Sequence, residues 1–230
     1  MNIKSKNPWN NKNPWRGENQ HKQRVKVVTS QKQNQREPAH FIQKYDPLIH
    51  YLNGQTVIPP DQLYSDGGIR REPSFEHKQP GITSICRGFM FAPKLRVGDK
   101  IIYVTKKKPD RKIVCALEII HTFPSHTAAA TYYQNNNLLP LPVNCCVAGN
   151  AFRLPGNGGS NPPHTDNFYL QKRVIPYPVF HVCKKIKENL VQPNTIQDKV
   201  INKILGVNYD NYQNQKKITK LQFAKLVKLI

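Results

Sequence analysis

Acidic residues are scarce in this sequence. Its 230 residues include 14 Asp and Glu against 35 Lys and Arg, which gives a net charge of +21 at pH 7. The surplus is spread along the chain, because residues 1–40 carry nine Lys and Arg against two Glu, and residues 184–230 carry ten Lys against three acids. Such an excess favours phosphate backbones or anionic lipid over acidic small molecules. We therefore expect nucleic acid, DNA or RNA, or a nucleotide as the partner; simple solubility of a chain rich in Lys and Asn is the alternative.

Secretion and membrane signals are also missing. The sequence has no Asn-x-Ser/Thr sequon, no apolar signal segment at its N-terminus, and no apolar run long enough to cross a bilayer. Its five cysteines are odd in number, which argues against a complete disulfide framework. We expect an intracellular protein with free thiols and no membrane contact, placed in the cytoplasm or nucleus, or a viral protein in an infected cell.

Motifs of known catalytic and metal sites are absent as well. There is no Cys-x-x-Cys, and the adjacent Cys145 and Cys146 do not have a zinc-knuckle spacing. Ser160 follows two glycines without forming Gly-x-Ser-x-Gly, and no phosphate-binding Gly-Lys-Ser/Thr occurs. His181 and Cys183 would share one face of a strand, which suits either a ligand pair or a half-buried face. We expect no metal, no cofactor and no catalytic residue.

The clearest order lies between residues 82 and 123. A turn at Arg96-Val-Gly-Asp99 precedes the apolar run Ile101–Thr105, and a basic turn then leads to a second run, Ile113–Ile120. Two β-branched runs bounded by turn residues predict a β-hairpin.

Weaker patterns predict the elements around the hairpin. Ser125 can cap a helix through Gln134, and Asn194 or Thr195 can cap a helix that runs to Leu205 and stops at Gly206. Thr219-Lys-Leu-Gln222 is a capping box that predicts a last helix ending at Ile230. The other predictions are a short helix or turn within Phe41–Leu52, a loop over 53–81, and an edge strand over Tyr177–Cys183. We predict an α+β protein in three parts: a disordered basic tail (1–39), a domain (40–190) and a C-terminal helical extension packed on it (191–230).

The hairpin also carries a resemblance. Val97-Gly98-Asp99-Lys100, an apolar strand, a basic turn and a strand ending in Glu118-Ile119-Ile120 resemble the core of PUA-like domains, the superfamily that includes ASCH, EVE and YTH readers. Upstream, Asp66-Gly67-Gly68, Pro73, Phe75, Ile82-Thr83, Arg87 and Phe91-Ala92-Pro93 resemble its nucleotide-modification-associated branch. The resemblance covers roughly residues 60–150. It implies a small, partly closed β-barrel with peripheral helices.

The resemblance further implies a pocket for a base, read by aromatic stacking and by hydrogen bonds to the base edge. The candidate base-binding residues are Tyr64, Asp66, Phe75, Thr83, Arg87 and Tyr103. Asp66 either accepts a base N–H or closes its turn, Arg87 contacts phosphate or pairs with Glu118, and Phe75 stacks on a base or packs in the core. Both tryptophans, Trp9 and Trp15, lie in the tail. A tryptophan cage of the YTH kind is therefore not expected within the barrel.

The hairpin tip is the predicted phosphate site. Five cations crowd it, and like charges repel one another unless an anion is bound. These residues are Lys106, Lys107, Lys108, Arg111 and Lys112. Two other functions stay open: a nucleotide-modifying or nucleotide-hydrolysing enzyme of the same superfamily, using Asp66, Asp99, Lys100 and Glu118, and a basic structural or packaging protein, such as a viral one. The repeated Asn-Pro-Trp element of the tail either binds bases or a partner, or has no role.

Overall fold

The computed structural model describes residues 36–45, 73, 75, 77–84, 91–105, 110–142, 144–148, 150, 170–190, 193–211 and 215–230. Residues Glu37–Ile230 form one compact unit. The predicted tail lies outside the described residues as far as residue 35, and so does most of the loop predicted over 53–81.

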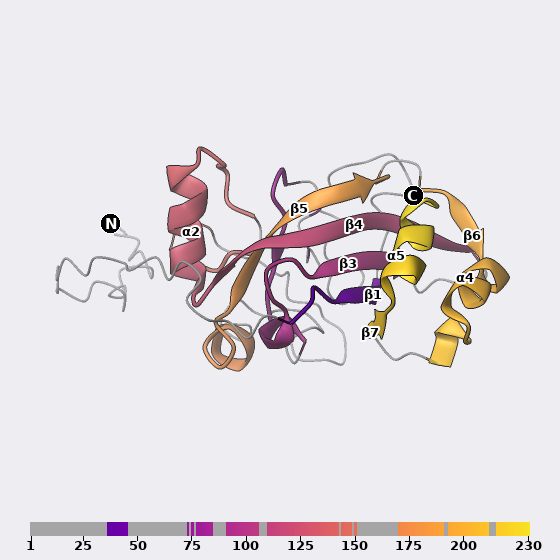
Figure 1. The fold of residues 1–230 in the computed structure, drawn as a ribbon. Coiled ribbons are helices and arrows are strands. Elements are labelled where there is room, and N and C mark those ends of the chain that lie inside the picture. Colours follow the sequence, from indigo (N-terminus) through magenta and orange to yellow (C-terminus); the bar gives the residue numbers. More distant parts are fainter. Residues whose placement is uncertain are drawn as a thin grey trace, which may run out of the picture. The chain divides into compact units, whose positions relative to one another are not determined.

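The fold is mixed α+β, built on a seven-stranded sheet (Figure 1). Its strands follow the order β2-β5-β4-β3-β1-β7, and β6 pairs with β4 beside this path. Among the described strands only β1 and β3 pair in parallel; the other pairs are antiparallel. Among the described residues no ladder joins β2 to β7, so hydrogen bonds do not close the sheet. The strands are β1 His40–Tyr45, β2 Gly81–Ile82, β3 Lys100–Thr105, β4 Asp110–Phe123, β5 Phe180–Glu188, β6 Thr195–Gln197 and β7 Gln215–Ile218.

The predicted hairpin is confirmed as β3 and β4. The turn before it is closed by Asp99, whose amide donates to the Arg96 carbonyl at 3.0 Å and whose carboxylate accepts from the Arg96 amide at 2.9 Å. Gly98 has a φ of +88°, a conformation in which other residues are strained. The other Asp99 oxygen accepts from the Ala39 amide at 2.8 Å, so the turn also fixes the start of β1.

Both faces of the sheet are covered, which explains why β3 is an unbroken apolar run. Ile101 and Tyr103 point into one cluster, and Ile102 and Val104 point into another. Alternation along the strand puts successive side chains on opposite faces, and a strand buried on both faces needs apolar residues throughout. The first cluster includes Phe75, Ile82, Phe91, Leu95, Leu117 and Cys183, and the second Ile42, Ile113, Ile196, Ile201, Leu205, Phe223 and Leu226.

Helices flank the two ends of the long strand β4 (Figure 1). Helix α2, His126–Asn135, follows the end of β4, whereas β6, which leads into α4, pairs with its beginning. The helices α4, Asp198–Leu205, and α5, Lys220–Val227, pack against each other. No helix in the described part of the chain is long and apolar enough to cross a membrane. Shorter turns are η1 Ala92–Lys94, the π-helical η2 Leu170–Val174 and η3 Tyr209–Asn211.

Three helix signals are confirmed. The Ser125 hydroxyl accepts from the Ala128 amide at 3.1 Å, Gly206 ends α4 in the left-handed conformation, and Thr219 and Gln222 form a complete capping box. The predicted start of α4 is wrong, because Thr195 lies in β6. The N-cap is Gln197, which makes no side-chain cap bond. The last helix ends at Val227 rather than Ile230.

Two strand predictions need correction. The segment predicted as a helix or turn begins with β1, which pairs with β3 on one side and β7 on the other. Strand β5 begins after Pro178 and lies between β2 and β4, so it is not an edge strand. In both cases the neighbouring strands decide the structure, and they are distant in sequence. The C-terminal segment likewise adds β6 and β7 to the sheet, besides its helices.

Candidate nucleic-acid interface

Three of the predicted base-binding residues lie in the described part of the chain. Phe75, Thr83 and Tyr103 are 0%, 1% and 4% exposed. The rings of Phe75 and Tyr103 meet edge to face, with centroids 5.0 Å apart. The structure therefore brings these two aromatic residues together within the first core cluster. Tyr64, Asp66 and Arg87 lie outside the described residues.

The predicted phosphate site divides into two groups. Lys106, Lys107 and Lys108 lie outside the described residues. Lys112 is half-buried, its amide donates to the Thr105 hydroxyl at 3.0 Å, and its amino group donates to the Pro193 carbonyl at 3.2 Å. Arg111 is 1% exposed, so its placement argues against the predicted contact with phosphate.

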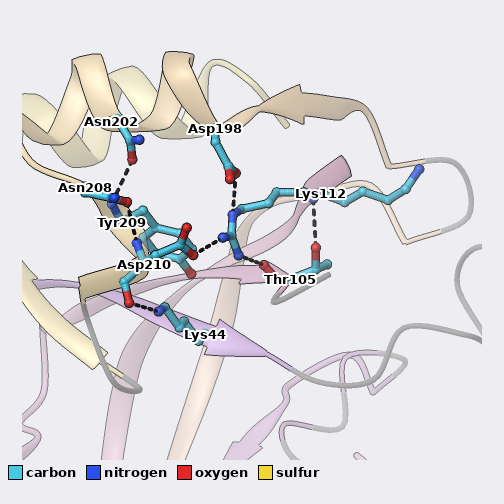
Figure 2. A network of polar contacts seen from close by, with 9 residues as sticks. Lys44, Thr105, Lys112, Asp198, Asn202, Asn208, Tyr209 and Asp210 are labelled. Carbon is cyan, nitrogen blue, oxygen red and sulfur yellow. Dashed lines mark hydrogen bonds and ion pairs between the residues drawn. The ribbon is translucent and has the colours of Figure 1, made fainter. Parts of the chain in front are cut away.

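Arg111 is the centre of a polar network with Asp198 of α4, Asp210 of η3 and Thr105, which are labelled in Figure 2. Its Nε donates to Asp198 Oδ1 at 2.5 Å, and its Nη2 forms an ion pair with Asp210. Its Nη1 donates to the Thr105 carbonyl at 3.2 Å, and its guanidinium lies 4.7 Å from the centre of the Tyr209 ring. A buried guanidinium is tolerated because two carboxylates and an aromatic face surround it.

The same network joins the C-terminal segment to the sheet. Lys44 of β1 donates to the Asp210 carbonyl at 3.2 Å and lies 4.9 Å from the Tyr209 ring centre. Asn202 of α4 accepts from the Tyr209 amide at 2.7 Å. Arg111 thus links β4 to α4 and η3, and its role in the described structure is to stabilise this junction.

Seven exposed lysines lie on the C-terminal elements. We call the following set the C-terminal lysine surface: Lys199 and Lys203 of α4, Lys216 and Lys217 of β7, and Lys220, Lys225 and Lys228 of α5 and its C-cap. Every member is exposed. The helices present them outward because Ile201, Leu205, Phe223 and Leu226 occupy the buried faces. The excess of Lys after residue 184 was visible in the sequence, but it did not identify these residues as a site.

This surface contains little opposing charge. From residue 199 onward the only described acidic residue is Asp210, which is already paired with Arg111. Burial lowers the pKa of the nearby His40 below 6.5, and the charges of Lys100 and Lys220 lower it further. The positive potential therefore extends from α5 to the start of β1 and β3.

Several other ionisable groups in the described part have structural roles. His181 is buried between the Thr122 hydroxyl at 2.9 Å and the Ala92 carbonyl at 2.7 Å. Glu118 pairs with Lys100 at 3.7 Å and with Lys184 at 3.3 Å. Burial raises the pKa of Cys145 to about 12, which disfavours a nucleophilic thiolate. No group of His, Cys, Asp and Glu within the described residues is arranged to hold a metal.

No protein-family model and no curated protein matches this chain. A solved structure of a hypothetical protein from Leishmania major aligns with a TM-score of 0.40 and 8% identity, covering 84% of this chain and 94% of that chain. The crystal structure of a ZmASCH mutant protein from Zymomonas mobilis aligns with a TM-score of 0.37 and 9% identity, covering 83% of this chain and 96% of that chain. Scores and identities this low support no conclusion about the fold or function of this chain.

Proposed function

We propose that this is a nucleic-acid-binding protein whose C-terminal lysine surface contacts phosphates. The observation that carries the proposal is the exposure of seven lysines on α4, β7, α5 and its C-cap, while the two described carboxylates beside them, Asp198 and Asp210, both pair with Arg111. Exposed lysines release condensed counterions when they meet a phosphate backbone, which gives affinity without sequence specificity.

Part of this charge has a second explanation. Strand β7 is the last strand of the sheet path, and exposed lysines on an edge strand prevent pairing with other chains. This explanation covers Lys216 and Lys217. It does not cover the lysines of α4 and α5, whose backbones offer no sheet edge. A phosphate-binding role accounts for all of them.

In more specific terms, we propose that the protein also binds a base in a pocket of a PUA-like barrel. Its residues are Tyr64, Asp66, Phe75, Thr83, Arg87 and Tyr103, with Lys106, Lys107, Lys108 and Lys112 as further phosphate contacts. Phe75 and Tyr103 contact each other in the first core cluster at 0% and 4% exposure, so a base would reach them only after displacing the residues that cover them. Arg111 is left out because it is committed to Asp198 and Asp210.

The test compares two triple variants that remove equal charge. One carries Lys216→Gln, Lys217→Gln and Lys220→Gln on the C-terminal lysine surface. The control carries Lys94→Gln, Arg96→Gln and Lys187→Gln at exposed positions elsewhere. Affinity for a labelled oligonucleotide is measured by fluorescence anisotropy over a salt series.

We expect the first variant to bind more weakly and to lose up to about 0.9 in the slope of log K against log salt for each lysine that contacts a phosphate. The control should keep most of the slope. If both variants lose the same amount, the charge acts only through its total. If the wild-type protein does not bind the oligonucleotide but assembles as its concentration rises, the structural alternative is favoured. Release of base or phosphate from a nucleotide would favour the enzyme.

A further inference from the structure

A second surface at the opposite end of β4 has a different chemistry. The rings of His121 and Tyr132 lie 4.7 Å apart, those of Phe123 and Tyr132 lie 5.3 Å apart, and those of His121 and Phe123 lie 6.1 Å apart. We call these three residues the aromatic triad. His121 is exposed, and the other two are half-buried. Aromatic rings in mutual contact thus remain accessible to solvent.

Strand geometry and pairing explain this accessibility. His121 and Phe123 are two residues apart on β4, so both side chains project from one face. Pairing of β4 with β3 begins at Glu118, opposite Lys100, so beyond that point β5 is the described neighbour of β4. Helix α2 then turns back after Ser125 and places Tyr132 against both rings.

The triad is held firmly by its surroundings. The Tyr132 hydroxyl donates to Gln79 Oε1 at 3.1 Å, and the neighbouring Tyr133 hydroxyl donates to the Gln79 carbonyl at 2.9 Å. Tyr133 is fully buried and anchors α2 in the cluster around Phe180. A pre-positioned ring loses little conformational freedom when a ligand stacks on it.

The charge around the triad suits an anion. The described residues of 77–84, 119–150 and 170–183 include no Asp or Glu. They do include the cations Lys78, Lys172 and Arg173, and Lys78 is exposed next to Gln79, which binds Tyr132. Carboxylates near the triad would repel a polyanion, so their absence from these described segments favours an anionic ligand. A patch that binds a protein through apolar contacts would not require their absence.

Resting on the proposed function, we infer that the aromatic triad stacks on unpaired bases, so that the protein holds single-stranded nucleic acid by its bases as well as by its phosphates. Bases in a duplex are already stacked on one another and are not offered to such a surface. Stacking on aromatic side chains accepts any base, because every base has a π face. The site would therefore add preference for single strands without sequence specificity.

The experiment compares a single strand of deoxyadenosines with an abasic strand of equal length, which has the same phosphates and no bases. Wild-type protein should bind the first more tightly. His121→Ala and Tyr132→Ala should each lose about fivefold or more in affinity for the deoxyadenosine strand, as loss of one stacked base does. Affinity for the abasic strand should stay unchanged.

Two further variants keep the test decisive. Tyr132→Phe retains the ring and loses the bond to Gln79, so it should bind nearly as wild type. Thr131→Ala changes an exposed neighbour on α2 and serves as the matched control. Quenching of the fluorescence of 2-aminopurine placed in the strand reports stacking directly. This quenching should fall in His121→Ala, because the exposed ring of His121 can be removed without opening the core.

The outcomes separate this inference from the proposed function. If wild-type protein binds both strands equally and the triad variants bind as it does, the triad is not a stacking site, but the lysine surface stands. If wild-type protein binds neither strand, both proposals fail together. Loss confined to the deoxyadenosine strand supports the inference.

Discussion

The two ends of β4 separate two kinds of chemistry. At its beginning, beside α4 and α5, the cations are exposed while the aromatic residues Tyr209 and Phe223 are buried at 1% and 5% exposure. At its end, beside α2, the aromatic triad is accessible to solvent and the cations are few. A nucleic acid offers charge along its backbone and flat rings at its bases. Under the two proposals, the lysine end would meet the first and the aromatic end the second.

The buried ionisable groups at the two ends of β4 also differ. Arg111 at the lysine end is a buried cation with two carboxylate partners. His126 at the aromatic end is 3% exposed and lies against the Phe180 ring, and burial lowers its pKa to about 4. One end therefore depends on ion pairs, and the other on keeping imidazoles neutral.

The largest expected effect is acid destabilisation of the aromatic end. Burial lowers the pKa of both His126 and His181 to about 4, whereas the value without such burial is 6.5. The unfolded chain then binds more protons between these values, so stability is lost as the pH falls from 6.5 to 4. Each ring contributes about 3 kcal/mol to this loss. Urea unfolding at a series of pH values measures it.

Substitution of His126 tests how much of this pH dependence of stability comes from its ring. His126→Gln removes one titrating ring and should remove about half of the pH dependence in this window. Equal dependence in the variant and the wild type would mean that His126 is accessible to protons in the folded state. The contrast between the two ends would then be weaker.

The second effect concerns the lysine end. Asp198→Asn together with Asp210→Asn leaves the guanidinium of Arg111 buried without an anion, which costs about 3–5 kcal/mol. Arg111→Met removes the charge itself, and the two carboxylates that it leaves are about 30% exposed and can be hydrated. Its loss of unfolding free energy should therefore be smaller. Chemical denaturation of the variants gives this order directly.

The same variants test the function of Arg111. Because its guanidinium is buried, Arg111→Met should leave the salt slope of oligonucleotide binding unchanged. A slope reduced by about one would instead show a direct phosphate contact and restore the original prediction from the sequence.

Local signals in the sequence were enough for part of this fold. The hairpin, the Ser125 cap, the Gly206 stop and the Thr219 capping box each depend on residues within a few positions, and all four are confirmed. No disulfide joins the described cysteines to one another. Such features need no knowledge of the tertiary structure.

Features that depend on distant partners were missed. Strand β1 owes its conformation to β3 and β7, which lie about 60 and about 175 residues further along the chain. Arg111 looked like part of a basic tip, because its partner Asp198 is 87 residues away. The aromatic triad was invisible for the same reason, since α2 must fold back before Tyr132 can meet His121. The sequence predicted the excess of lysine but not the face on which it gathers.

The smallest effects come from the helix caps, and they compare the two ends directly. Ser125→Ala removes the cap of α2, and Thr219→Ala removes the cap of α5; each should cost about 1 kcal/mol. Gln222→Ala should cost at least as much, because its side chain accepts from the Thr219 amide and also donates to the Leu205 carbonyl of α4, both at 2.9 Å. Hydrogen exchange should speed up at α2 amides in the first variant and at α4 and α5 amides in the others. Faster exchange at both ends in any one variant would show that the ends unfold together, and the separation drawn between them would not hold for their stability.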